Sequence, residues 1–272
     1  MSLQTSERRY RLGFIGGGKL AGSVVRGLVR AGFCPAGEIL VSEPNDVVAG
    51  ALRAEAGVDV AAGNREVAEK AEVILIGVKP GVVLEVIDGI AGAIEGKLVI
   101  SLAAGIRLAS MEAKAKARFM RAMTNTPAAV CQAATALARG SRTTAEDFVR
   151  ARALFGAIGF VAEVQDEQID PVTALAGSGP AFVYTMIEAL AAGGTKCGLP
   201  AEVSLGLATQ TVRGAAQLAL ESELSPEELR RMVITPGGTT AAGLAEMEKR
   251  ETAAGLSAAV EAASARGREM GL

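Results

Sequence analysis

The feature that most constrains this chain is a glycine-rich turn near its start, in residues 12–22, LGFIGGGKLAG. Residues 11–15, RLGFI, are mostly apolar and predict a strand, and small and aliphatic residues recur at helical spacing after the glycines. Gly16, Gly18 and Ala21 stand in the G-x-G-x-x-A spacing, which allows a tight turn, close approach of a pyrophosphate to bare backbone, and close helix packing. The turn therefore predicts a dinucleotide site, with an ordinary strand-to-helix turn as the alternative.

Short apolar runs then alternate with helical patterns up to about residue 168. From residue 171 onward no strand pattern recurs, and Gly198-Leu199-Pro200 and Ser225-Pro226 are helix stop and start signals. This order predicts an α/β fold, with a Rossmann-type, doubly wound and largely parallel sheet in residues 1–168 and an all-helical domain in residues 169–272. Strands are expected at 38–41, 73–77, 98–101, 118–120, 135–138 and 160–164, and later helices at 180–197, 201–222, 226–234 and 240–270, the last in one or two pieces.

Composition excludes several classes of protein. The chain of 272 residues has 28 basic and 30 acidic residues, a net charge of -2 that argues against a nucleic-acid partner. It lacks histidine, which excludes histidine-based triads and most zinc chemistry, and no metal site is expected. The absence of a long apolar run and of an apolar start argues against a membrane span or a secretory signal.

Two groups of residues bear on exposure and location. The three cysteines, Cys34, Cys131 and Cys197, are odd in number and far apart, and we expect buried, reduced thiols in a cytoplasmic protein. A local basic group is expected to line a solvated helix and strand edge; its members are Lys114, Lys116, Arg118 and Arg121.

Glu43 follows the second expected strand, where Rossmann folds meet the adenosine ribose. A carboxylate at this point hydrogen-bonds a ribose hydroxyl and repels a 2′-phosphate, which favours NAD. A basic residue such as Lys19 could still serve NADP, and a solvated loop glutamate is a third interpretation. The choice between NADH and NADPH therefore stays open.

Several loops carry polar or small residues at places suited to ligands. Residues 78–81, 103–105 and 123–127 follow expected strands, where a nicotinamide could pass. Residues 234–240, ITPGGTT, offer two glycines, three hydroxyls and the start of a helix, a combination suited to a carboxylate. The alternative for this last loop is a helix N-cap made by threonine.

Seven segments occur in order and at the right intervals: GFIGGGKLAGSVVRGL, VKPG, ISLAAG, RAMTNTP, ALAGSGPAFVY, GLP and TPGGTTAAGL. On these segments, from about residue 12 to the end, the chain resembles the Δ1-pyrroline-5-carboxylate reductases, the last enzymes of proline synthesis. The resemblance implies hydride transfer from NADPH or NADH to the C=N carbon of a small imine acid, giving L-proline. It also implies a homodimer that interlocks through the helical domain, often five dimers in a decamer, and an active site shared between subunits.

The resemblance assigns roles residue by residue. Thr240 and Thr235 would be the catalytic hydroxyls, with Thr240 orienting the ring nitrogen. The substrate would meet Asp166, Glu223, Thr235, Gly238, Thr239 and Thr240. The cofactor would meet Ile15, Gly16, Gly17, Gly18, Lys19, Leu20, Glu43, Asn64, Val78, Lys79, Pro80, Ala104, Asn125, Thr126 and Pro127.

Several positions depart from the family pattern. Thr235 replaces a serine and keeps the hydroxyl. Ala192 replaces an acidic residue and Arg230-Arg231 replaces a Lys-Asp pair, which bears on dimer contacts. Glu43 stands where Ser, Asn or Arg is common, which bears on the usual preference for NADPH.

Two other functions remain open from the sequence. A reductase of the same build, acting on 3-hydroxy acids or other imines, would rely on a catalytic lysine; the candidates are Lys196 and Lys249, and neither lies in a glycine-rich turn. A non-enzymatic NAD-binding or assembly protein would have no use for the TPGGTT loop.

Overall fold

The first unit of the chain is built around one sheet of eight strands. The computed structural model describes residues 9–270, which divide into a unit of residues 9–178 with 263–270 and a second unit of Gly179–Ala262. The domain boundary was expected between residues 168 and 169, shortly after the last strand. The first unit extends to Ser178 and so includes the helical turns that follow this strand.

The sheet has the order β3-β2-β1-β4-β5-β6-β7-β8. Neighbouring strands are parallel except for β6 and β7, which are antiparallel. The prediction of a Rossmann-type, largely parallel sheet is confirmed. The strands are β1 (Tyr10–Ile15), β2 (Ile39–Ser42), β3 (Asp59–Val60), β4 (Ala71–Ile76), β5 (Leu98–Ser101), β6 (Arg118–Met123), β7 (Ala133–Arg139) and β8 (Gly159–Glu163).

Some expected element bounds are wrong. Glu38 belongs to the 3-10 turn η1 (Ala36–Glu38) rather than to β2, and β3 was not expected, because two residues carry no periodicity. Gly77 and Val164 lie just beyond β4 and β8.

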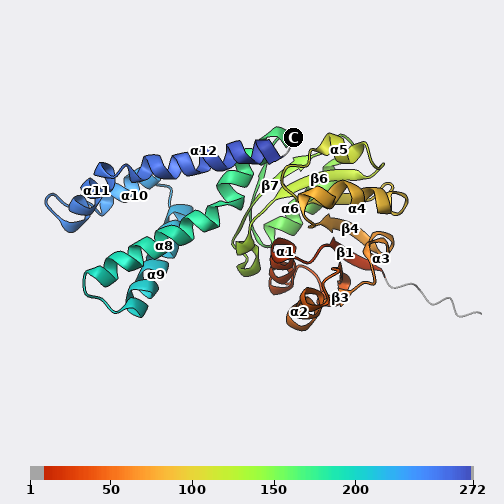
Figure 1. The fold of residues 1–272 in the computed structure, drawn as a ribbon, viewed down its shortest axis with the longest axis horizontal. Coiled ribbons are helices and arrows are strands. Elements are labelled where there is room, and N and C mark those ends of the chain that lie inside the picture. The colour runs from red at the N-terminus through yellow and green to blue at the C-terminus, as the bar shows by residue number, and fades with distance from the viewer. Residues whose placement is uncertain (1–8, 271–272) are drawn as a thin grey trace, which may run out of the picture. The chain divides into compact units, whose positions relative to one another are not determined.

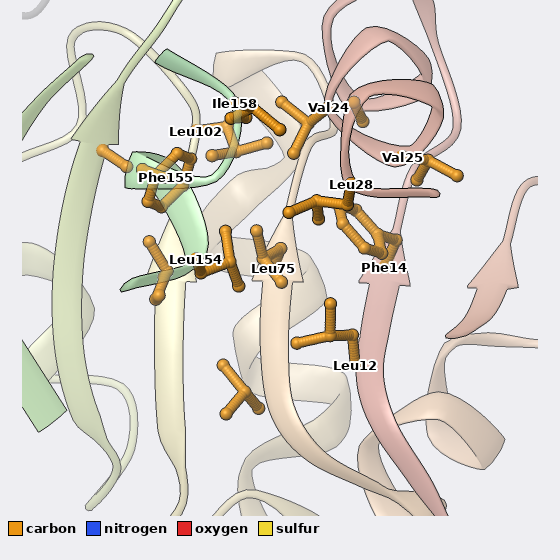
Figure 2. Packing of buried hydrophobic residues seen from close by; sticks show 14 of the residues in the cluster. Leu12, Phe14, Val24, Val25, Leu28, Leu75, Leu102, Leu154, Phe155 and Ile158 are labelled. Atoms are coloured by element: carbon orange, nitrogen blue, oxygen red, sulfur yellow. The ribbon is translucent and has the colours of Figure 1, made fainter. Parts of the chain in front are cut away.

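Helices cover both faces of the sheet (Figure 1). Alternate strand residues point to opposite faces, so the apolar core forms two layers. One layer packs under α1 (Lys19–Arg30), α2 (Asp46–Ala56) and α6 (Ala145–Gly156); the other packs under α3 (Asn64–Lys70), α4 (Val83–Ile90) and α5 (Leu108–Glu112). Figure 2 shows part of the first layer, with Leu12, Phe14, Val24, Val25, Leu28, Leu75, Leu102, Leu154, Phe155 and Ile158 labelled.

A glycine lets α1 lie directly against a neighbouring turn. A Cβ added at Gly27 would lie 2.1 Å from the carbonyl oxygen of Ala128 in η4 (Thr126–Val130), far inside van der Waals contact. The side chain of Cys131 also reaches this point, since its Sγ donates to the Gly27 carbonyl at 3.6 Å. The position of α1, and with it the start of the helix after the glycine turn, is thus fixed by close backbone packing.

The second unit is helical. It holds α8 (Gly179–Lys196), α9 (Ala201–Glu221), α10 (Pro226–Met232), α11 (Thr239–Lys249) and most of α12 (Thr252–Met270). The segment expected at 240–270 is two helices, separated at Arg250 and Glu251, where Glu251 has a φ of 51°. Within residues 9–270, none of the helices has the length and apolarity to cross a bilayer.

Few side chains of the second unit are buried. Ser204 and Ala208 are buried between residues 179 and 262, all of which the structure describes. Large apolar side chains of the same helices are exposed, among them Leu190, Leu205 and Leu207. The second unit therefore has little core of its own.

Two expectations about exposure are wrong. Arg121 is 1% exposed and lies within the sheet rather than at a solvated edge, because its guanidinium is covered by the turn after β8, where it bonds Asp166. Of the cysteines, Cys34 is buried, Cys131 is half-buried and Cys197 is exposed.

Candidate functional site

The glycine turn is held by backbone bonds on both sides. The amide of Gly16 donates to the Ser42 carbonyl and the amide of Gly77 donates to the Ile15 carbonyl, each at 2.8 Å. Gly16 has a φ of 92°, and a Cβ there would lie 2.9 Å from the backbone of Gly77 and Val78. Glycine is therefore required at Gly16 both by conformation and by space.

The next residue of the turn is tied to the end of β2. The amide of Gly17 donates to Oε2 of Glu43 at 2.8 Å, and the amide of Asn45 donates to Oε1 of Glu43 at 3.0 Å. The Glu43 carboxylate, which is half-buried, is thus fixed beside the turn by two backbone donors.

The third glycine of the turn faces open space. Gly18 is the N-cap residue of α1 with extended backbone, and no side chain caps the helix. A Cβ at Gly18 would meet nothing within 4 Å, and the first helical turn carries no acidic residue. The amides at this positive helix end are therefore suited to an anion, and the residues fit the pyrophosphate of a dinucleotide.

A cavity of about 570 Å³ opens beside this helix end, where β1, β4, β5 and β6 finish. This is the edge at which open α/β sheets bind ligands. Nine residues expected to bind the cofactor line the cavity: Gly18, Lys19, Leu20, Val78, Lys79, Pro80, Ala104, Asn125 and Thr126. The remaining expected residues lie elsewhere in the same unit: Ile15 at the end of β1, Gly16 and Gly17 in the turn, Glu43 and Asn64 after β2 and β3, and Pro127 in η4.

Two polar side chains at the cavity are already bonded within the protein. Asn125 donates to the Ala176 carbonyl and accepts from the Ala134 amide, both at 3.1 Å. The hydroxyls of Thr124 and Thr135 are 2.8 Å apart. The Asn125 side chain therefore shapes the cavity wall, and the turn that contains it presents backbone groups to a ligand.

Asn64, at the start of α3, is engaged in the same way. Its Oδ1 accepts a hydrogen bond from the Ser42 hydroxyl at 2.7 Å. This bond ties the last residue of β2 to the helix after β3.

The sequence missed one wall of the cavity. Thr173, Gly177 and Ser178 line it, and they belong to or follow η6 (Thr173–Gly177), a π-helical turn. π-helical turns are frequent at functional sites. The only signal in the sequence was the small-residue run AGSG, which was interpreted as a helix start. The other unexpected lining residues are Gly77, Leu102, Ala103, Met123 and Thr124.

Asp166 lies in the sheet-bearing unit, in η5 (Asp166–Gln168). Its Oδ1 accepts from Nη1 of Arg121 at 2.6 Å and its Oδ2 accepts from the Leu108 amide at 3.1 Å. Asp170 is joined to the same group, with Oδ2 accepting from Nη2 of Arg107 at 3.1 Å. The Asp166 carboxylate therefore already serves a buried ion network, and its assignment to the substrate stays a prediction.

The threonine loop lies in the helical unit. Gly237 has a φ of 70°, and the Gly238 amide donates to the Thr235 carbonyl at 2.9 Å. Gly238 is the N-cap residue of α11 and no side chain caps the helix. The alternative interpretation of this loop, a helix capped by threonine, is therefore wrong. No side chain caps the amides of the first turn of α11, and the Thr239 and Thr240 hydroxyls lie beside them.

The remaining expected substrate residue is also in the helical unit. Glu223 is exposed between α9 and α10.

Two family models match parts of the chain. One, described as pyrroline-5-carboxylate reductase dimerisation, matches residues 166–270. The other, described as NADP oxidoreductase, coenzyme F420-dependent, matches residues 11–105. The second match covers the glycine turn, Glu43 and most of the cavity wall.

Similar proteins cover nearly the full length. Proteins called pyrroline-5-carboxylate reductase from Pisum sativum and Synechocystis are 42% and 40% identical, with 96% of this chain and 96% and 98% of theirs aligned. The structure of pyrroline-5-carboxylate reductase from Coxiella burnetii is 33% identical, with a TM-score of 0.87 over 97% of this chain and 99% of that one. The Plasmodium falciparum pyrroline carboxylate reductase with NADP bound is 27% identical, with a TM-score of 0.87 over 97% and 98%.

Proposed function

Because the chain belongs to the pyrroline-5-carboxylate reductase family, we propose that it reduces 1-pyrroline-5-carboxylate to L-proline with NADPH or NADH, the last step of proline biosynthesis. The observation that carries the proposal is the presence, in one chain, of an uncapped helix start beside a cavity at the sheet edge and a second uncapped helix start in a threonine-rich loop. The first suits a dinucleotide and the second suits a small carboxylate.

The sheet-bearing unit would hold the cofactor, which supplies a hydride when it is bound. The first turn of α1 and Gly18 would hold the pyrophosphate by backbone amides. The backbone around Ala104 and Asn125 would border the nicotinamide ring at the wall of the cavity. Because these walls are built from strand ends and packed turns, the ring would be held in one orientation.

The threonine loop would hold the substrate. The backbone of Gly238 and the first turn of α11 would bind its carboxylate, and the Thr240 hydroxyl, which is half-buried, would orient the ring nitrogen. An iminium carbon is already electrophilic, so positioning of two ligands is the main requirement, and it can supply about 7 to 11 kcal/mol. This suits a chain that contains no histidine.

Assembly and location are part of the proposal. The match to a dimerisation model and the exposed apolar helices of the second unit support a homodimer; five such dimers would form the decamer that the family resemblance implies. The compartment that we propose is the cytoplasm.

The direct test offers the purified protein 1-pyrroline-5-carboxylate with NADH or NADPH, and compares it with a 3-hydroxy acid and NAD or NADP. We expect oxidation of the reduced cofactor with the imine and formation of proline. Turnover of the hydroxy acid alone would favour the other reductase of this build, and cofactor binding without turnover of either would favour a non-enzymatic protein.

Thr240→Ala tests the assignment of the substrate loop. Loss of one orienting hydrogen bond should lower kcat for imine reduction about tenfold, while fluorescence titration should show unchanged binding of the reduced cofactor. Thr209→Ala, which removes an exposed α9 hydroxyl bonded to the Leu205 carbonyl, is the matched control. A Thr240→Ala protein with parental kcat would remove Thr240 from the mechanism.

A further inference from the structure

The segment after β2 is acidic where it meets the glycine turn. Residues 43–46 are Glu-Pro-Asn-Asp and contain no basic residue. In Rossmann folds this segment borders the 2′ position of the adenosine ribose, which carries a hydroxyl in NADH and a phosphate in NADPH. The donors and charges of this segment therefore decide which of the two groups can be accommodated.

Glu43 cannot easily turn away from that position. Its two carboxylate oxygens accept from the amides of Gly17 and Asn45, at 2.8 and 3.0 Å. A rotation that removed its charge from the ribose would break both bonds. A carboxylate offers about four acceptor sites, so two bonded amides leave capacity for a hydroxyl that donates.

The start of α2 is not available to a phosphate either. Asn45 caps this helix, with Oδ1 accepting from the amides of Val47 at 3.0 Å and Val48 at 3.2 Å. Pro44 has no amide hydrogen, and Asp46 adds a negative charge in the first helical turn. An anion at this place would meet acceptors and negative charge instead of donors.

The basic side chains on neighbouring helices are engaged or face another way. Arg26 on α1 lies 3.2 Å from Glu55 and Arg65 on α3 lies 2.8 Å from Glu69. Lys19 lines the cavity at the strand ends, which Glu43 does not. Among the described residues of this segment, nothing supplies the cation that a 2′-phosphate requires.

We infer that Glu43 makes this protein select NADH over NADPH. The inference rests on the proposed function only in that a nicotinamide dinucleotide binds at the glycine turn. The ribose hydroxyl of NADH donates to the anchored carboxylate, whereas the 2′-phosphate of NADPH cannot donate and is repelled by it.

The experiment measures equilibrium binding of NADH and NADPH by nicotinamide fluorescence, in the absence of substrate. For the parental protein we expect a Kd for NADPH at least about tenfold above that for NADH. Raising the ionic strength to about 0.5 M should narrow this ratio, because screening weakens a repulsion. If the 2′-phosphate instead bound to a cationic site, salt would weaken the binding of NADPH more than that of NADH, and the ratio of the Kd for NADPH to that for NADH would rise.

Glu43→Gln isolates the charge. Its amide oxygen can still accept from Gly17, so we expect the NADPH-to-NADH ratio of Kd values to fall toward one and to lose its salt dependence. A purely structural role would weaken both cofactors equally and leave the ratio unchanged. Glu95→Gln removes the same charge from an exposed site before β5, away from this segment, and should keep the parental ratio.

The outcomes separate this inference from the proposed function. Equal or tighter binding of NADPH by the parental protein overturns the inference even if imine reduction is observed. Preferential binding of NADH supports it even if the imine is not reduced. Binding of neither cofactor overturns both, and the salt series on the parental protein decides the matter if Glu43→Gln does not fold.

Discussion

Arg121 places a guanidinium inside the sheet at 1% exposure. Burial of an unpaired charge would be very unfavourable, and this one is compensated by the Asp166 carboxylate at 2.6 Å, with an oxygen of Asp170 at 3.9 Å. Arg107 bonds the Asp166 carbonyl at 3.0 Å as well as Asp170. The network joins β6 to the turns that follow the last strand.

Replacing Arg121 by Met should therefore destabilise the protein strongly. Removal of the arginine leaves the buried carboxylate of Asp170 and the half-buried carboxylate of Asp166 under-compensated, and we expect a loss of about 3 to 5 kcal/mol in the free energy of unfolding. Urea denaturation measures it. Lys114→Met, which breaks an exposed pair with Asp88, should change stability by less than about 1 kcal/mol; equal effects of the two substitutions would contradict this account.

A second ion pair gives a prediction about pH. Nε and Nη2 of Arg118 bond both oxygens of Asp147, at 2.7 and 3.0 Å, and Asp147 closes a capping box with Thr144. Burial alone would raise the pKa of the Asp147 carboxyl, but the hydrogen bonds from Arg118 and Thr144 hold that pKa below its ordinary value. The stability that this depressed pKa represents is present above the unfolded-state pKa and is lost as the pH falls through the folded-state pKa.

Asp147→Asn should accordingly cost about 1 to 3 kcal/mol of unfolding free energy at pH 7. The difference from the parental protein should shrink as the pH falls below about 4, the ordinary pKa of aspartate. Urea denaturation across this range checks it, and a difference that is constant with pH would show that the carboxylate charge is not involved.

At this scale the sequence predicted poorly what single charges do. Arg121 was interpreted as exposed because its local neighbours are basic, and nothing local indicates that its partners lie 45 residues and more further along the chain. The place of Glu43 after the second strand, by contrast, is set by local pattern. Its bond to the Gly17 amide could not be foreseen, and its contact with the cofactor stays a prediction.

Elements were predicted better than residues. Seven of the strands gave apolar runs between turns, and the glycine turn located the first helix. The elements that the sequence did not predict have no hydrophobic periodicity. They are the two-residue strand β3 and the π-helical turn η6, which forms one wall of the cavity. The antiparallel pairing of β7 with β6 follows from the short connection through η4, which leaves no room for a crossover helix.

Gly27→Ala tests the close packing of α1 on η4. The added methyl would overlap the Ala128 carbonyl, so α1 must shift, and we expect a loss of about 1 to 3 kcal/mol. Thermal unfolding measures it. Gly50→Ala on α2 has open space around the new methyl and should stabilise the protein by about 0.5 to 1 kcal/mol, as expected in a helix interior. A neutral Gly27→Ala would mean that α1 is not fixed by this contact.

At the scale of the whole molecule, the match of the helical unit to a dimerisation model supports a homo-oligomer. Many leucines of this unit are exposed and few of its residues are buried. The resemblance to a dimeric family accounts for this exposure, which no pattern within a single helix indicates. Amphipathic periodicity places the apolar face but does not say whether the same chain or a second copy covers it.

Leu207→Lys should therefore weaken self-association. Leu207 lies on α9 with 56% exposure, and covering a leucine contributes about 1.5 to 3 kcal/mol, so we expect the dissociation constant of the oligomer to rise at least about tenfold. Sedimentation velocity over a concentration series measures it. Val47→Lys, at an 81% exposed site on α2, is the control, and an unchanged oligomer in Leu207→Lys would place this side chain outside the interface.

The strand at one margin of the sheet, β3, spans only Asp59–Val60. Sheets of different molecules join when a long open margin offers a row of unsatisfied amides and carbonyls to an incoming strand. A strand of two residues offers too few of these backbone groups, and one of its two side chains is the carboxylate of Asp59. Growth of a fibril from this side of the sheet is therefore disfavoured.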